Sequence, residues 1–202
     1  MSLIPAFELG LWNAWILVLS LFLMIIGVTP LASRMFFIGK EKPESSSRIH
    51  NPSGLFSKKE KKIANISMMI AFASYIYSIF VPLKLGTAWF YVGLFVYLVG
   101  LIFGTTAQID FVRPPLDEPA TKGAYRFSRN PMYLGMFLIY IGIGIACVSW
   151  IYLLVAVVDV ILDNKVFIIA EERWCLEHYG DTYRQYMNRT PRWIGIPKSK
   201  KE

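Results

Sequence analysis

Five runs of apolar residues, each close in length to the hydrocarbon core of a bilayer, constrain the fold of this chain more than any other feature. They cover residues 9–28, 63–83, 87–104, 133–148 and 151–169. A helix of about 20 residues spans about 30 Å, one hydrocarbon thickness. A hydrophobic fraction of 55% with 17% charged residues is also too apolar for an ordinary soluble domain. The sequence therefore predicts an all-α integral membrane protein with about five transmembrane helices.

One domain is expected over residues 1–202, because this length suits a single helix bundle. Within it, residues 1–104 contain three N-terminal spans and a basic loop. Residues 105–202 contain a polar loop, a helical hairpin and a C-terminal cap.

Positive charges lie on segments that should share one side of the membrane. The loop after the first run carries eight lysines and arginines, including Arg34, Lys40, Lys42 and Arg48, whereas the connection between the second and third runs offers only Lys84. The positive-inside rule then predicts a multi-pass protein with its N-terminus outside and its C-terminus in the cytoplasm. Because the charges flank the spans, the net charge of +7 favours a membrane surface over nucleic acid as a partner.

The stretch at residues 122–135, KGAYRFSRNPMYLG, places a basic loop directly before an apolar helix. Pro131 suits the first turn of that helix, and Asn130 is the expected N-cap. The free amides at the helix N-terminus, reinforced by Arg126 and Arg129, can hold a carboxylate or ribose hydroxyls. The alternative is a basic loop that reaches lipid headgroups behind an ordinary proline cap.

Aromatic rings and a carboxylate pair extend this candidate site. Glu171 and Glu172 follow the fifth run, and the apolar hairpin returns them to the face that carries the polar stretch. The pair could bind an ammonium group and hydroxyls or offset a sulfonium charge, while Tyr125 and Tyr133 could pack on an adenine. Taken alone, the two glutamates are also typical of a solvated helix end.

Ionisable residues also occur within the fifth run. Asp159 and Asp163 are four residues apart, on one helical face, and charges at membrane depth normally face a protein interior or a wet cavity. They could equally belong to an ion path. His50 and His178 are isolated, so no metal site is predicted, and no catalytic residue is assigned.

Glycines predict where helices approach closely and where one breaks. Gly135, Gly142 and Gly144 in the fourth run are expected to allow close packing against a neighbouring helix. Gly180 is expected to interrupt the C-terminal helix, whose second part could lie over the site as a lid.

The polar stretch, the hairpin and the segment EERWCLEHYGDTYRQYMNRTPRWIG together resemble membrane methyltransferases typified by isoprenylcysteine carboxyl methyltransferase; phospholipid N-methyltransferases are similar. The resemblance covers residues 110–195. Its pattern is Gly-x-Tyr, Arg-[His/Asn]-Pro-x-Tyr, a paired Glu and Tyr-Gly-x-x-Tyr. It implies a membrane-embedded methyltransferase that uses S-adenosylmethionine and has a cytoplasmic C-terminal cofactor-binding segment.

The resemblance also implies where the cofactor lies: between the loop, the start of the following helix and the glutamate pair, under the C-terminal segment. The residues that match the cofactor-binding motif are Tyr125, Arg129, Asn130, Pro131, Met132, Tyr133, Glu171 and Glu172.

Two departures from the pattern bear on the acceptor. Asn130 stands where the motif has histidine, so acid–base catalysis by histidine is not implied. Phe167 stands where the prenylcysteine enzymes carry an arginine for the substrate carboxylate. The expected acceptor is therefore a lipid amine or another apolar nucleophile that arrives from the bilayer.

Two other classes of protein share parts of this pattern. Membrane sterol-type reductases that bind NADPH have a comparable C-terminal arrangement, and a small transporter or structural bundle could use Asp159 and Asp163. The paired glutamates and the length of 202 residues favour the methyltransferase.

Overall fold

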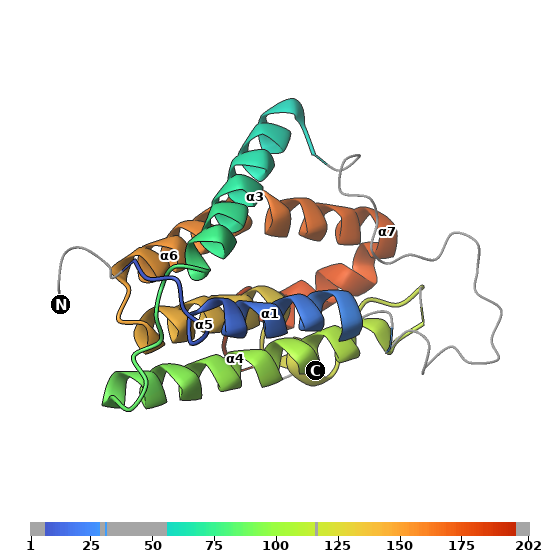
Figure 1. Cartoon of the computed structure of the whole chain (residues 1–202). Coiled ribbons are helices and arrows are strands. Elements are labelled where there is room, and N and C mark those ends of the chain that lie inside the picture. The colour runs from blue at the N-terminus through green and yellow to red at the C-terminus, as the bar shows by residue number, and fades with distance from the viewer. Residues whose placement is uncertain (1–6, 29–30, 32–55, 116, 197–202) are drawn as a thin grey trace.

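The computed structural model describes residues 7–28, 31, 56–115 and 117–196, and within these residues it contains helices and no strand (Figure 1). The all-α prediction is thus confirmed for them. The helices are α1 (Trp15–Leu23), the π-helix η1 (Met24–Val28), α3 (Lys58–Ser78), α4 (Ala88–Val112), the 3-10 helix η3 (Gly123–Arg126), α5 (Pro131–Ala146), α6 (Trp150–Lys165) and α7 (Phe167–Arg189).

The first helix begins later than the run of apolar residues predicts. Residues 9–14 are not helical, because Asn13 ties this segment to the end of α3. Its side-chain amide donates to the carbonyls of Glu8 and Ile79, at 2.6 and 2.7 Å, and the Ala14 amide donates to Val81. The prediction of a span that starts at residue 9 is therefore wrong.

The fifth apolar run is not one helix. The backbone turns at Val166 (φ −121°, ψ −69°), whose fully buried side chain anchors the turn between α6 and α7. Glu171 and Glu172 consequently lie near the start of α7, whereas the sequence placed them at the far end of one continuous helix. The third run also extends further than predicted, since α4 continues to Val112.

Glycines set the distance between α4 and α5. A Cβ atom on Gly135 would lie 2.7 Å from the Cα of Gly104, and one on Gly142 would lie 2.5 Å from the backbone nitrogen of Tyr97. Gly144 packs in the same way against α6. The packing role predicted for the three α5 glycines is confirmed.

The helices expose many large apolar side chains. Examples are Leu23 on α1, Met69 on α3, Phe95 on α4 and Leu154 on α6. Among the described residues, α4 is the one helix both long and apolar enough to cross a membrane, and α5 is apolar but shorter.

The polar segments that carry the candidate site gather at one end of the bundle. Figure 1 shows the C-terminal end of α4, the start of α5 and much of α7 at the same end. The predicted basic loop with Arg34, Lys40, Lys42 and Arg48 lies outside the described residues.

Candidate functional site

The polar stretch is anchored to the end of α4. Asp110 of α4 accepts a hydrogen bond of 2.9 Å from the Ala124 amide in η3. The preceding residue, Gly123, has φ +62°, and a Cβ atom there would collide with the Asp110 carboxylate. Glycine is therefore required at this turn, and the loop leaves α4 in a fixed direction.

Asn130 and Pro131 begin α5 as predicted, but the asparagine side chain does not cap the helix. Its Nδ2 donates instead to the carbonyl of Arg192, at 3.1 Å. The Ser128 hydroxyl donates to the same carbonyl, at 3.2 Å, and accepts from the Asn130 amide. Asn130 thus occupies the predicted N-cap position, but its side chain makes no cap bond, because the C-terminal segment offers a competing acceptor.

Residues 190–195, which we name the C-terminal clasp, lie against the loop before α5. The Arg129 amide donates to the carbonyl of Pro191 and the Gly195 amide to that of Phe127, both at 3.0 Å. Upstream of the clasp, α7 bends at Gly180 (φ +54°), which confirms the predicted break. The chain thus returns to hold the loop from the side of α7.

A buried ion-pair network joins the clasp, the loop and α7. Glu172 is 4% exposed, and its Oε2 lies 2.5 Å from Nη2 of Arg192. Its Oε1 lies 3.3 Å from Nη1 of Arg129, an ion-pair distance without hydrogen-bond alignment. Nε and Nη1 of Arg129 are buried and have no hydrogen-bond partner in the described part of the protein. Two cations therefore face one carboxylate, which leaves donors for an anionic ligand group.

Glu171 has a different environment from its neighbour. Its carboxylate accepts a hydrogen bond of 2.8 Å from the Tyr133 hydroxyl at the start of α5. The Glu171 side chain is exposed, whereas that of Glu172 is buried. Desolvation by the neighbouring protein atoms raises the pKa of Glu171 to about 7; the bond from Tyr133 opposes the rise and the charge of Glu172 adds to it.

Tyr125 and Met132 lie in an aromatic cluster with Tyr183 and Tyr186 of α7. The Tyr186 hydroxyl donates to the carbonyl of Tyr125, at 2.7 Å. Burial raises the pKa of the Tyr125 phenol well above its ordinary value. Because the Tyr125 ring is covered by protein, its contact with an adenine stays a prediction.

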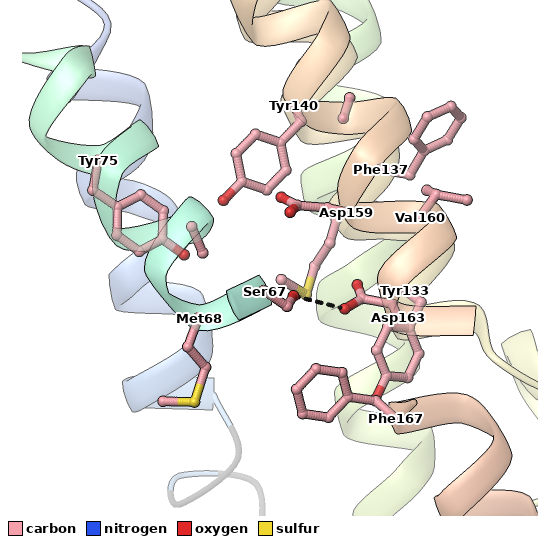
Figure 2. A pocket seen from close by; sticks show the side chains of 13 residues that line it. Ser67, Met68, Tyr75, Tyr133, Phe137, Tyr140, Asp159, Val160, Asp163 and Phe167 are labelled. Carbon is pink, nitrogen blue, oxygen red and sulfur yellow. Dashed lines mark hydrogen bonds between the residues drawn. The ribbon is translucent and has the colours of Figure 1, made fainter. Parts of the chain in front are cut away.

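A cavity of about 240 Å³ lies between α3, α5 and α6 (Figure 2). Tyr133 lines it, and so does the pair Asp159 and Asp163, which the structure confirms on one face of α6. The sequence did not predict the α3 wall, which includes Ser67 and Tyr75. The signal was the spacing of the buried serines, since residues 67, 74 and 78 follow a helical period within α3.

An ion pair holds α3 to α7 beside this cavity. Arg173 donates to both carboxylate oxygens of Glu60, at 3.2 and 3.3 Å, and these bonds lower the pKa of Glu60. The ring of Phe56 meets that of Phe167 edge-on, with centroids 5.5 Å apart. In the described segments, no group of three or more His, Cys, Asp or Glu residues could hold a metal ion.

Comparison with known families adds one finding to this geometry. The profile of a protein family described as phospholipid methyltransferase matches residues 69–182, more than half of the chain. This range includes the loop before α5, both glutamates and most of the cavity, but not the C-terminal clasp. No curated protein matches the chain.

Proposed function

Since the chain belongs to the phospholipid methyltransferase family, we propose that it transfers a methyl group from S-adenosylmethionine to a lipid or another apolar acceptor. The position of Tyr133 carries this proposal. Its ring lines the cavity between α3, α5 and α6, and its hydroxyl donates to Glu171. One side chain thus borders both a cavity suited to an acceptor and a carboxylate expected to contact the cofactor.

The residues around the N-terminal end of α5 fit a cofactor that carries both a carboxylate and a positive charge. Nε and Nη1 of Arg129, which have no hydrogen-bond partner although Nη1 pairs with the charge of Glu172, are suited to the carboxylate, and Glu171 is suited to the ammonium or sulfonium charge. The backbone amides of Met132 and Tyr133, in the first turn of α5, add hydrogen-bond donors at the N-terminus of this helix. When bound, the cofactor supplies a methyl group whose bond to sulfur breaks with the electron pair left on sulfur.

The protein's part in this reaction is alignment and exclusion of water. An in-line displacement needs the acceptor and the methyl group held close together more than it needs an acid. Tyr133, held by its bond to Glu171, fixes the wall between the two ligands. Glu172 instead holds Arg129 and the clasp, so we assign it a positioning role.

We also propose a multi-pass arrangement with the N-terminus outside and the C-terminus in the cytoplasm. The exposed apolar side chains on α1, α3, α4 and α6 support a membrane location, because so large an apolar surface is unfavourable in water. The orientation rests on the distribution of positive charges along the sequence. Met68 lines the cavity and is 64% exposed, so the cavity opens through an apolar surface. An acceptor would therefore arrive sideways from the bilayer.

Calorimetry tests the cofactor assignment. The purified protein in detergent should bind S-adenosylhomocysteine and should not bind NADPH. Binding of NADPH alone would instead indicate a reductase, and binding of neither would overturn the proposal.

A matched pair of variants locates the site. Glu171→Ala should weaken binding of S-adenosylhomocysteine by about tenfold, the loss of one charge-assisted contact. Glu177→Ala removes an exposed carboxylate from the same helix and should leave the affinity unchanged. Equal affinities for the two variants would contradict the assignment of Glu171.

A further inference from the structure

The first turns of α3 carry more positive charge than the protein neutralises. Four of the first five residues of this helix are lysines, namely Lys58, Lys59, Lys61 and Lys62. All four are exposed, and none forms an ion pair within the described part of the chain. The carboxylate among them, Glu60, already accepts bonds from the Ser57 amide and from Arg173 of α7. The lysines therefore form an uncompensated cationic surface.

This charge lies where it disfavours the helix. The N-terminus of a helix carries partial positive charge, so acidic side chains stabilise it and lysines do not. The capping box of Ser57 and Glu60 already begins α3, which means that the helix does not need the lysines to start. Figure 1 shows the first turns of α3 projecting beyond the other helices. A cationic helix end that costs stability and projects outward is suited to an anionic ligand.

The outer face of α3 continues from the lysines as an apolar stripe. We name as the outer stripe the residues Lys58, Lys62, Ile66, Met69 and Ile76, whose spacings of four, four, three and seven place them on one helical face. The last three are 44%, 71% and 47% exposed, whereas the buried serines of α3 face the bundle. From Lys62 to Ile76 the stripe is about 21 Å long at about 1.5 Å per residue. One leaflet of the hydrocarbon core is about 15 Å thick, so the stripe is long enough for one lipid chain.

We propose that the outer stripe of α3 binds an anionic phospholipid, with the phosphate beside Lys58 and Lys62 and an acyl chain along Ile66, Met69 and Ile76. Lysines directly before an apolar span attract anionic headgroups, and the apolar part of the stripe matches the chain that follows the headgroup. No residue of the stripe lines the cavity between α3, α5 and α6. The lipid site is thus separate from the proposed methyl-transfer site and does not depend on it.

Two lipids with the same acyl chains test this site. The full-length protein in detergent is titrated with palmitoyl-oleoyl phosphatidylglycerol and with palmitoyl-oleoyl phosphatidylcholine, which differ in net charge, and bound lipid is measured by native mass spectrometry. The wild type should bind the anionic lipid about tenfold more tightly. The double variant Lys58→Gln with Lys62→Gln should lower this preference by about threefold or more. Equal affinities in the wild type, or an unchanged preference in the double variant, would overturn the inference.

Three controls separate the two halves of the site. Lys84→Gln with Arg184→Gln removes two charges from other segments and should keep the full preference, and an equal loss there would show that net charge alone is responsible. Ile66→Ser with Met69→Ser should weaken both lipids and leave their ratio unchanged, and unchanged affinities would contradict the acyl-chain contact. An excess of inorganic phosphate should not displace the lipid, since displacement would indicate a site for phosphate alone. Circular dichroism of each variant checks that its helices are retained.

Discussion

Adjacent side chains can have opposite functions when a helix turns one of them inward. Glu172 faces the protein interior, where Arg129 and Arg192 neutralise it. Glu171 is exposed and accepts a hydrogen bond from the hydroxyl of Tyr133. One glutamate therefore stabilises the loop and the clasp, while its neighbour remains available to a ligand.

The buried glutamate should contribute strongly to stability. Glu172→Gln leaves two guanidinium groups without a counter-charge, so the free energy of unfolding should fall by about 3 kcal/mol. Titration with SDS, followed by circular dichroism, measures the change. Glu171→Gln at pH 8 should show no such fall, and an equal loss in both variants would contradict the distinction between them.

The pH dependence of stability should reveal the raised pKa of Glu171. Its pKa is about 7 in the folded protein and about 4.5 in the unfolded chain, so the folded state binds the proton more tightly. Wild-type stability relative to Glu171→Gln should therefore fall as the pH rises from about 4.5 to about 7, and stay constant above that. The free energy of unfolding of both proteins, measured at pH 5 and at pH 8, tests this direction. A wild type that becomes more stable relative to Glu171→Gln at pH 8 would refute the prediction.

At the scale of helices, the approach of α4 to α5 fixes where the N-terminal end of α5 lies. Glycines on both helices allow backbone contact, as at Gly135 against Gly104. Asp110 of α4 also anchors the start of the polar stretch at Ala124. Both ends of the stretch, at Ala124 and at Gly135, are therefore held against α4.

A side chain inserted between these helices should disrupt the bundle. Gly142→Val places a Cβ atom 2.5 Å from the backbone nitrogen of Tyr97, so the helices must separate. We expect a loss of about 2 kcal/mol or more in the same SDS titration. Gly27→Ala is the matched control, because nothing lies within 4 Å of its new Cβ atom. Comparable losses in the two variants would argue against close packing at Gly142.

Helix identity and helix packing followed from the sequence, whereas several boundaries did not. Apolar runs and small residues at helical positions are local patterns, so the sequence could predict the helices and the positions of close approach. The late start of α1 depends on a bond from Asn13 to Ile79, and the orientation of Asn130 depends on Arg192. The motif residues of the site came from the resemblance, but the α3 wall of the cavity came from tertiary packing. Contacts between distant segments leave little trace in local sequence.

Across the whole molecule, the clasp contacts a loop that lies some sixty residues earlier in the chain. The clasp supplies carbonyls to Ser128, Arg129 and Asn130 and a guanidinium to Glu172. The loop before α5 is thus held from α4 on one side and from the clasp on the other.

Removing the clasp should weaken cofactor binding. A chain that ends after Arg189 loses every clasp contact with the loop, so its affinity for S-adenosylhomocysteine should fall by about tenfold or more. A chain that ends after Ile196 keeps all of these contacts and is the control. Calorimetry on both proteins decides the matter, and unchanged affinity in the shorter chain would show that the clasp does not position the loop.

The ring of Tyr133 lines the cavity and its hydroxyl bonds Glu171, and this double contact has a thermodynamic consequence. A ligand that shifts the ring from the cavity side also shifts the hydroxyl that bonds Glu171. Coupling of this kind is reciprocal, so each ligand must change the affinity for the other by the same factor. Cofactor affinity measured with and without an amphiphile in the cavity would therefore report the coupling free energy between the two ligands, which the side chain of Tyr133 would transmit.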